Sequence, residues 1–290
     1  MNFGERTITF SCNGNWLYGV LSLPESSVSR GVVIVVGGPQ YRVGSHRQFT
    51  LLARHLAAHG VPVLRFDYRG MGDSEGDVRT FEDLDDDLRS AIDGFLNEVP
   101  SVNEVVIWGL CDAASAALFY SHQDKRVTGL VLLNPWVRTD EGAAKVYLKH
   151  YYVARLFEPR LWSKILQGRF NYSEAAQSFL KTIGTVLKRK KSTVAVPNRE
   201  GSKSCDRTPL PQRMFTGLSC FEGRLLLITS GNDLTAQEFL DMVRGSPEWQ
   251  QLLASPRVSR LDLPEATHTF SRREWRDQVA AWTKDWIRSW

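Results

Sequence analysis

The sequence lacks an apolar run of the length that crosses a membrane. Its nearest candidate, residues 31–38, has only the length of a strand, whereas a membrane helix needs roughly 18 or more apolar residues. The opening residues, MNFGERTITF, contain no basic stretch followed by an apolar one, which is the pattern of a secretory signal. We therefore expect no membrane span and a cytoplasmic protein.

Cysteine is scarce, since the 290 residues include only 4, at positions 12, 111, 205 and 220. No two of them have the CxxC spacing of zinc and redox sites, so we predict neither a metal nor a cofactor. Without an export signal, reduced thiols are the simplest interpretation. Residues that form a core are abundant, with 42% hydrophobic and 11% aromatic residues, and this composition excludes a mainly disordered chain.

Charge is unevenly distributed along the chain. The whole chain carries a net +4, but residues 138–213 hold 16 Lys/Arg and 6 Asp/Glu, a net of +10, which leaves −6 for the rest. Such asymmetry indicates two parts with different tasks. No recognisable nucleic-acid-binding module accompanies the basic region, so we do not expect nucleic acid as a partner.

Segments typical of strands and helices alternate along most of the chain. Apolar runs bounded by turn residues predict strands, and apolar residues at helical spacing predict helices. We expect strands at residues 7–12, 17–23, 31–36, 61–66, 105–108, 127–133, 225–229 and 258–263, and helices at residues 48–59, 84–97, 236–243, 272–290 and directly after 111. This alternation predicts an α/β fold with a mostly parallel sheet and helices on both faces.

The alternation fails between residues 134 and 220. This region holds two basic amphipathic segments typical of helices and one polar segment typical of a loop, at residues 143–170, 173–190 and 193–212. We predict that residues 1–133 and 221–290 form the core and that residues 134–220 form a basic helical cap inserted into it.

The strongest chemical motif is WGLCDAA at residues 108–114. It follows a predicted strand, opens a helix, and has the small-x-nucleophile-x-small pattern of a nucleophile elbow, with Cys111 in the usual place of serine. The neighbours two residues away, Gly109 and Ala113, must be small because the turn is tight. We therefore predict that Cys111 is a nucleophile; the alternative is an inert cysteine at the start of a packed helix.

Two effects on the Cys111 thiol oppose one another. The N-terminus of a helix favours negative charge, which would stabilise a thiolate and an oxyanion. The neighbouring carboxylate of Asp112 disfavours that thiolate. The sequence does not decide which effect prevails.

The partners of a catalytic triad follow in the chain. Asp233 comes directly after one predicted strand and His268 directly after the next, and nucleophile, acid and histidine is a known triad order. We predict that His268 takes the thiol proton and that Asp233 orients it. Asn232 and Glu265 are weaker candidates for the acid. Considered alone, Asp233 could be a helix N-cap residue and His268 an ordinary loop histidine, and these are the alternatives to catalytic roles.

An oxyanion hole needs two backbone N–H groups near the nucleophile. We assign them to Asp112 and to Gly38, which follows the first long buried strand, although a plain glycine turn is the alternative. The residues after Gly38 are candidates for lining the substrate pocket: Gln40, Tyr41, Arg42, His46 and Arg47. Arg42 and Arg47 are candidate anion contacts, or charges that face solvent.

The segment at residues 67–74, DYRGMGDS, predicts a structural turn. We expect Asp67 and Ser74 to satisfy amide groups of the loop rather than to take part in catalysis.

Together, GGPQ, FDYRGMGDSEG, GLCDAA, GNDLT and ATHTF resemble the α/β-hydrolase superfamily. GGPQYRVGSHRQF with GLCDAASA resembles, more narrowly, the exosortase A system-associated hydrolase 1 family. The resemblance implies an α/β-hydrolase fold and bacterial gene neighbourhoods for exopolysaccharide synthesis, but supplies no substrate. The chain departs from the lipase pattern in having Val36 where many relatives have His, Ala113 for Gly, and Cys111 for Ser.

These residues favour one function over two alternatives. The first is a hydrolase that cleaves an ester or thioester through an acyl-cysteine intermediate, with residues 134–220 as a lid over the strand ends. The second is an acyltransferase that passes the acyl group to an alcohol or amine. The third is a fold that only binds a partner, against which the complete triad argues.

The basic, aromatic character of the predicted cap bears on the partner. Lys149, Tyr151, Tyr152, Arg155 and Trp162 suit an anionic or carrier-bound acyl substrate, such as one on coenzyme A, an acyl carrier protein or a sugar. Peripheral contact with an anionic membrane surface is a further option for this region, and a solvated surface is the plainer one. The sequence gives no indication of oligomeric state.

Overall fold

The computed structural model describes residues 2–26, 28–38, 40–137 and 208–290. Most of the predicted cap, including both of its basic segments, therefore lies outside the described residues. Met1–Arg138 together with Pro209–Trp290 form one compact unit. In the described part of the chain, no helix is both long and apolar enough to cross a membrane.

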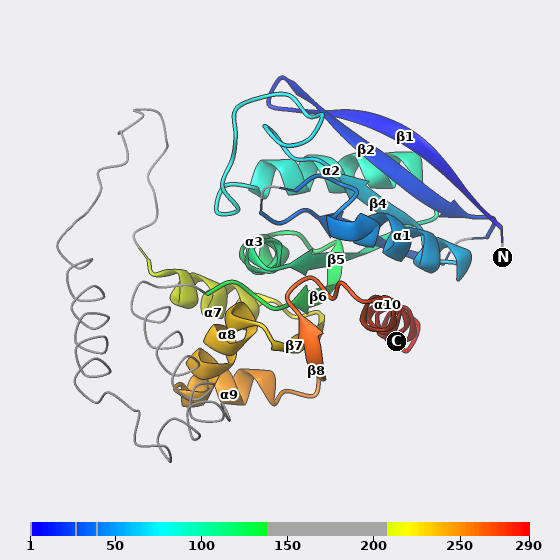
Figure 1. Cartoon of the computed structure of the whole chain (residues 1–290). Helices are drawn as coiled ribbons and strands as arrows, with labels where there is room; N and C mark the ends of the chain where they lie inside the picture. The colour runs from blue at the N-terminus through cyan, green and yellow to red at the C-terminus, as the bar shows by residue number, and fades with distance from the viewer. Residues whose placement is uncertain (1, 27, 39, 138–207) are drawn as a thin grey trace, which may run out of the picture. The chain divides into compact units, whose positions relative to one another are not determined.

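The described strands form one sheet in the order β1-β2-β4-β3-β5-β6-β7-β8. β2 is antiparallel to both of its neighbours, and every pair from β4 to β8 along the sheet is parallel (Figure 1). The strands are β1 Phe3–Cys12, β2 Asn15–Pro24, β3 Arg30–Val35, β4 Val63–Phe66, β5 Glu104–Leu110, β6 Val127–Leu133, β7 Arg224–Asn232 and β8 Val258–Thr267. The predicted α/β fold with a mostly parallel sheet is confirmed.

Helices lie on both faces of this sheet. α1 contacts α10, while α2 and α7 both contact α3. Figure 1 shows α10 on the opposite side of β5 to β8 from α3, α7 and α8. The α-helices are α1 Gln48–Ala58, α2 Asp85–Glu98, α3 Asp112–Tyr120, α7 Leu210–Cys220, α8 Leu234–Arg244, α9 Pro247–Leu253 and α10 Arg273–Ile287, and the short 3-10 helices are η1 Ser45–Arg47 and η2 Ser121–Gln123.

The central strands have almost continuously apolar sequences because helices cover the sheet on both faces. Every residue of β3 after Arg30 is buried, and β4 is buried throughout. The antiparallel β1–β2 hairpin turns at Asn13 and Gly14, whose φ angles are 49° and 80°. Positive φ at both central residues is the requirement of a type I′ hairpin turn, which Asn-Gly meets at little cost.

Helix α7 lies in a segment that the sequence suggested was cap and partly loop. It begins at Leu210 after Pro209, with Pro211 in its first turn, a place where the missing N–H of proline costs nothing. Gly217 lets α7 approach α3 closely, because a Cβ there would lie 2.1 Å from the Leu118 carbonyl oxygen. This close packing places α7 in the same compact unit as the sheet.

Candidate active site

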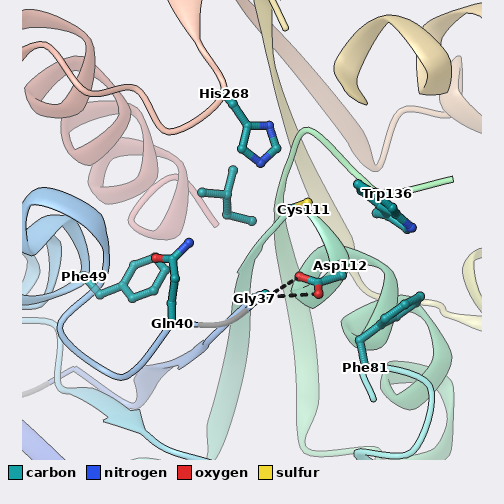
Figure 2. Close-up of a pocket in the computed structure, with 10 residues that line it drawn as sticks. Gly37, Gln40, Phe49, Phe81, Cys111, Asp112, Trp136 and His268 are labelled. Carbon is teal, nitrogen blue, oxygen red and sulfur yellow. Dashed lines mark hydrogen bonds between the residues drawn. The ribbon is translucent and has the colours of Figure 1, made fainter. Parts of the chain in front are cut away.

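A pocket of about 390 Å³ lies at the carboxyl end of the central strands, where open parallel sheets bind ligands. Figure 2 shows His268 reaching the pocket from one side, with Cys111 and Asp112 on the other. The lining residues are Gly37, Gly38, Gln40, Phe49, Phe81, Leu110, Cys111, Asp112, Trp136 and His268. The pocket therefore combines an apolar, aromatic wall with the predicted nucleophile and base.

Cys111 occupies the sharp turn between β5 and α3. Its φ and ψ are 64° and −124°, a conformation that a residue with a side chain adopts only under constraint. The constraint includes backbone bonds, since the Cys111 N–H donates to the Leu133 carbonyl at 2.9 Å and the Cys111 carbonyl accepts from Trp136 N–H at 3.2 Å. The elbow predicted from WGLCDAA is thus present, and the thiol is directed into the pocket.

Small neighbours make this turn feasible. A Cβ on Gly109 would lie 2.7 Å from the carbonyl carbon and oxygen of Ala113, closer than van der Waals contact permits. The following residues of α3, from Ala113 to Tyr120, are all buried, so the helix packs tightly against the sheet. The need for a small residue at position 109 is therefore steric, as expected from the motif.

His268 pairs with Asp233 rather than with either alternative acid. The His268 Nδ1 and an Asp233 carboxylate oxygen are 2.8 Å apart, whereas Asn232 and Glu265 are exposed. The Asp233 side chain is only 7% exposed and also caps α8, accepting the N–H groups of Thr235 and Ala236 at 3.1 Å each. The cap fixes the carboxylate, and the carboxylate in turn orients the imidazole.

The surroundings of His268 favour its protonated form. Hydrogen bonds first to Asp233 and then to Cys111 raise the pKa of His268 to about 10, against the opposing effect of burial. At neutral pH the imidazole is therefore charged and carries a proton on each ring nitrogen, and Nδ1 faces the Asp233 carboxylate. The three residues predicted as a triad meet at one edge of the sheet, in an arrangement that can move a proton between thiol and imidazole.

Asn134, which the sequence analysis did not single out, holds the strand ends around His268. Its buried side-chain amide donates to the Ser230 hydroxyl at 2.8 Å and to the His268 carbonyl at 3.1 Å. Its side-chain oxygen accepts the Ser230 N–H at 2.9 Å. The available signal was a polar residue directly after the apolar run of β6.

The predicted oxyanion donor Gly38 faces an internal anion, the carboxylate of Asp112, instead of an open space. Gly38 N–H donates to both carboxylate oxygens of Asp112 at 2.9 Å, and Ala113 N–H donates to one of them at 2.9 Å. The backbone N–H of Asp112 also interacts with its own carboxylate. Burial raises the pKa of Asp112, although these backbone donors and the charge of His268 oppose the rise.

Of the candidate pocket residues after Gly38, only Gln40 lines the cavity. Its side-chain oxygen accepts from the Ser45 N–H at 3.0 Å, so its orientation is fixed. Tyr41 is 49% exposed, and His46 and Arg47 are exposed on η1. The pocket role expected for these three residues is not visible in the described part of the chain.

Arg42 points toward carboxylates and not into the pocket. Its guanidinium pairs with Asp67 and, at 2.5 Å, with Asp73, and Asp67 is fully buried. Because a buried carboxylate needs a partner, Arg42 is engaged in the fold rather than available to an anionic substrate. Sequence proximity to Gly38 suggested the pocket, but the distant Asp67 decides the orientation.

The structural role predicted for residues 67–74 is confirmed. Asp67 accepts the Arg42 N–H at 2.6 Å and the Asp73 N–H at 3.2 Å. The Ser74 hydroxyl donates to the Asp67 carbonyl and accepts the Tyr18 N–H, at 2.6 and 3.0 Å. This turn ties the loop after β4 to the β1–β2 hairpin.

Three aromatic residues of the pocket wall were also missed. Phe49 comes from α1, Phe81 from the loop before α2, and Trp136 from the segment after β6. Their convergence depends on tertiary packing, and their sequence neighbourhoods carry no motif. Among the described residues, no group of three His, Cys, Asp or Glu side chains is placed to hold a metal ion.

Comparison with known proteins shows what this chain is similar to. A family model described as "Alpha/beta hydrolase family" matches residues 32–282. The polyketide transferase grgF of a Penicillium species is 33% identical over 93 residues, which are 30% of this chain and 31% of that protein. The chain thus spans about a third of this relative's length.

Two further similarities cover more of the chain. The quorum-quenching protein AidA of Acinetobacter baumannii (strain MDR-ZJ06) is 24% identical over 251 residues, covering 83% of this chain and 71% of that protein. An esterase of Pyrococcus furiosus has a similar structure, with a TM-score of 0.65 and 17% identity over 99% of this chain and 92% of that one. Since the family model also matches most of the sequence, the chain belongs to the alpha/beta hydrolase family.

Proposed function

We propose that this protein cleaves a thioester or ester through an acyl-cysteine intermediate. The observation that supports this most strongly is the meeting of Cys111, His268 and Asp233 at one pocket. In the first half-reaction the sulfur attacks the acyl carbonyl, and His268 gives its proton to the leaving thiol or alcohol. In the second, His268 takes a proton from water, which attacks the acyl-cysteine and releases the acid.

The pocket wall favours an apolar acyl group. Phe49, Phe81, Leu110 and Trp136 provide apolar surface around the sulfur, and burial of an apolar acyl chain against such surface is favourable. A thioester is the preferred class of substrate, because exchange between two thioesters is nearly neutral in energy.

Acyl transfer to an alcohol or amine is the second candidate. The similarity to a polyketide transferase supports it, although that match covers only part of either chain. The acyl-cysteine would be the same, and only the acceptor of the second half-reaction would differ. Incubation with graded alcohol and amine acceptors separates the two functions, since transfer yields a new ester or amide while hydrolysis yields the free acid.

The resemblance to the narrower family also suggests the cellular process in which the protein acts. Similarity to exosortase A system-associated hydrolase 1 favours a role linked to exopolysaccharide synthesis, in a cytoplasm that keeps Cys111 reduced. A carrier-bound acyl substrate and peripheral membrane contact through the basic segment 138–213 belong to the same proposal, and most of that segment lies outside the described residues.

The decisive experiment is intact-mass analysis of the protein after exposure to short and long acyl thioesters and aryl esters. We expect an acyl adduct on Cys111 and a loss of turnover by several powers of ten in Cys111→Ala, because triad residues act as a unit. Cys220→Ala is the matched control, since Cys220 is an exposed free cysteine on α7. Unchanged turnover in Cys111→Ala would refute the assignment, and no adduct with any probe would favour binding without catalysis.

A further inference from the structure

The Asp112 carboxylate occupies the position that an oxyanion would need. Two backbone N–H groups donate to it, those of Gly38 and Ala113. Gly38 and Asp112 are the residues whose N–H groups we assigned to the oxyanion hole. Figure 2 shows this carboxylate next to Cys111 at the pocket, joined to the Gly37–Gly38 segment by dashed lines.

The contact between the Asp112 carboxylate and the loop at Gly37 is close. A Cβ on Gly37 would lie 2.4 Å from an Asp112 carboxylate oxygen, so the loop is already in van der Waals contact with the carboxylate. An N–H group that donates to a carboxylate cannot stabilise an oxyanion with the same proton at full strength. Two negative charges at one low-dielectric site also repel each other.

We propose that Asp112 is a gate on the oxyanion hole, which its carboxylate fills at rest and must leave before the Cys111 sulfur can acylate. This inference rests on the proposed function, because it concerns the acylation step. Asp112 thereby limits the rate of that step and favours substrates that bind well enough to displace it. It acts on the donors and not on the reacting bond, so it is a positioning residue and not a catalytic one.

The charged groups that face Asp112 are compatible with its departure. His268 lies across the pocket and attracts the carboxylate. Tyr68, whose pKa is raised to about 12 by burial and by the charges of Asp112 and Asp87, stays neutral and adds no second negative charge. Burial already disfavours the charged form of Asp112, which lowers the cost of emptying the hole.

The test compares two reactions of Cys111 in the wild type, Asp112→Asn and Asp112→Ala. In acylation by p-nitrophenyl acetate, the sulfur–carbon bond forms, an oxyanion develops on the carbonyl, and nitrophenolate leaves. In alkylation by iodoacetamide, the sulfur displaces iodide and no oxyanion forms. We expect acylation to accelerate by about tenfold or more, in the order Ala, Asn, Asp, while alkylation changes far less.

Each outcome decides between the gate and an alternative. If acylation slows, Asp112 anchors the Gly38 loop and the gate is wrong. If acylation and alkylation accelerate equally, Asp112 acts only through its charge on the thiol, and the gate is again wrong. If Cys111 is not acylated even in the wild type, the proposed function fails instead of the gate.

Two control variants accompany the comparison of acylation and alkylation rates. The near-isosteric Asp112→Asn retains an acceptor for Gly38 N–H, so it keeps the experiment interpretable if Asp112→Ala does not fold. Asp77→Asn removes an exposed carboxylate that does not line the pocket and should leave both rates unchanged. Thermal unfolding of every variant shows whether the rates are measured on folded protein.

Discussion

At the scale of single residues, His268 links the site to the pH dependence of stability. Its pKa is raised from 6.5 to about 10, chiefly by the hydrogen bond to Asp233, so the folded state holds the proton more tightly than the unfolded chain. The stabilisation is fully present below the unfolded pKa of about 6.5 and is lost as the pH rises through about 10.

We therefore expect Asp233→Asn to be less stable than the wild type, by a margin that depends on pH. Asparagine is also a good N-cap and keeps one oxygen for the α8 N–H groups, but it lacks the negative charge that favours protonated His268. The gap in melting temperature should be largest near pH 6 and should close toward pH 10, as measured by circular dichroism. A gap that stays constant or grows with pH would contradict the assignment of the pair.

The convergence of Cys111, Asp233 and His268 could be predicted from sequence, whereas the orientation of the Asp112 side chain could not. Cys111, Asp233 and His268 each follow a strand closely, and local patterns reveal strands. The orientation of the Asp112 carboxylate depends on Gly38, which is remote in sequence and approaches only through strand pairing. The same reason applies to Arg42, whose partner Asp67 belongs to another strand end.

At the scale of elements, the junction of β5 and α3 should tolerate no added atom. A Cβ on Gly109 would lie 2.7 and 2.8 Å from backbone atoms of Ala113 and Ala114. Relief of this clash would require the helix backbone to move. Gly109→Ala should lose about 1–3 kcal/mol of unfolding free energy in urea denaturation, as overpacked sites do, and should also lose activity because the elbow moves.

Gly245→Ala is the matched control for that substitution. Gly245 ends α8 with φ at −83°, and its nearest neighbours to an added Cβ are 3.5 Å or more away. Alanine there should stabilise the fold by about 0.4–1 kcal/mol by restricting the unfolded chain. Equal losses in the two variants would mean that crowding at position 109 is not the cause.

The ends of some strands, and one short helix, could not be predicted from the sequence pattern. β7 and β8 extend beyond their predicted ends to Asn232 and Thr267, because polar residues near the site continue the ladder without the apolar signal. α9, Pro247–Leu253, was not predicted: it has 7 residues, too few for a clear periodicity. Its cap at Ser246 and its buried Trp249 and Leu253 are visible only in the fold.

At the scale of the whole molecule, Arg30 joins the start of the central sheet to the end of the chain. Its guanidinium donates to the carbonyls of Ile287 and Trp290 at 2.9 and 2.6 Å and pairs with Glu104 at 2.5 Å. It also lies 3.5 Å from the centre of the Trp290 ring. One side chain thus connects β3, β5 and the end of α10.

Loss of the Arg30 contacts should lower the free energy of unfolding without changing the residues that line the pocket. Arg30→Ala should lower the unfolding free energy by about 2 kcal/mol, because it leaves partly buried carbonyls without a charged donor. Arg273→Ala, which removes a guanidinium that is 83% exposed, should change it by less than about 0.5 kcal/mol. Urea denaturation measures both, and an equal, small effect would show that Arg30 is an ordinary surface charge.

The strained backbone at Cys111 has a consequence for how such a protein changes over time. Stability and the proposed reaction favour different residues there, since a positive φ suits glycine whereas an acyl-cysteine intermediate requires a thiol. Lineages that no longer need the reaction would be free to relax this turn. Glycine in place of Cys111 is the change that such relaxation would favour.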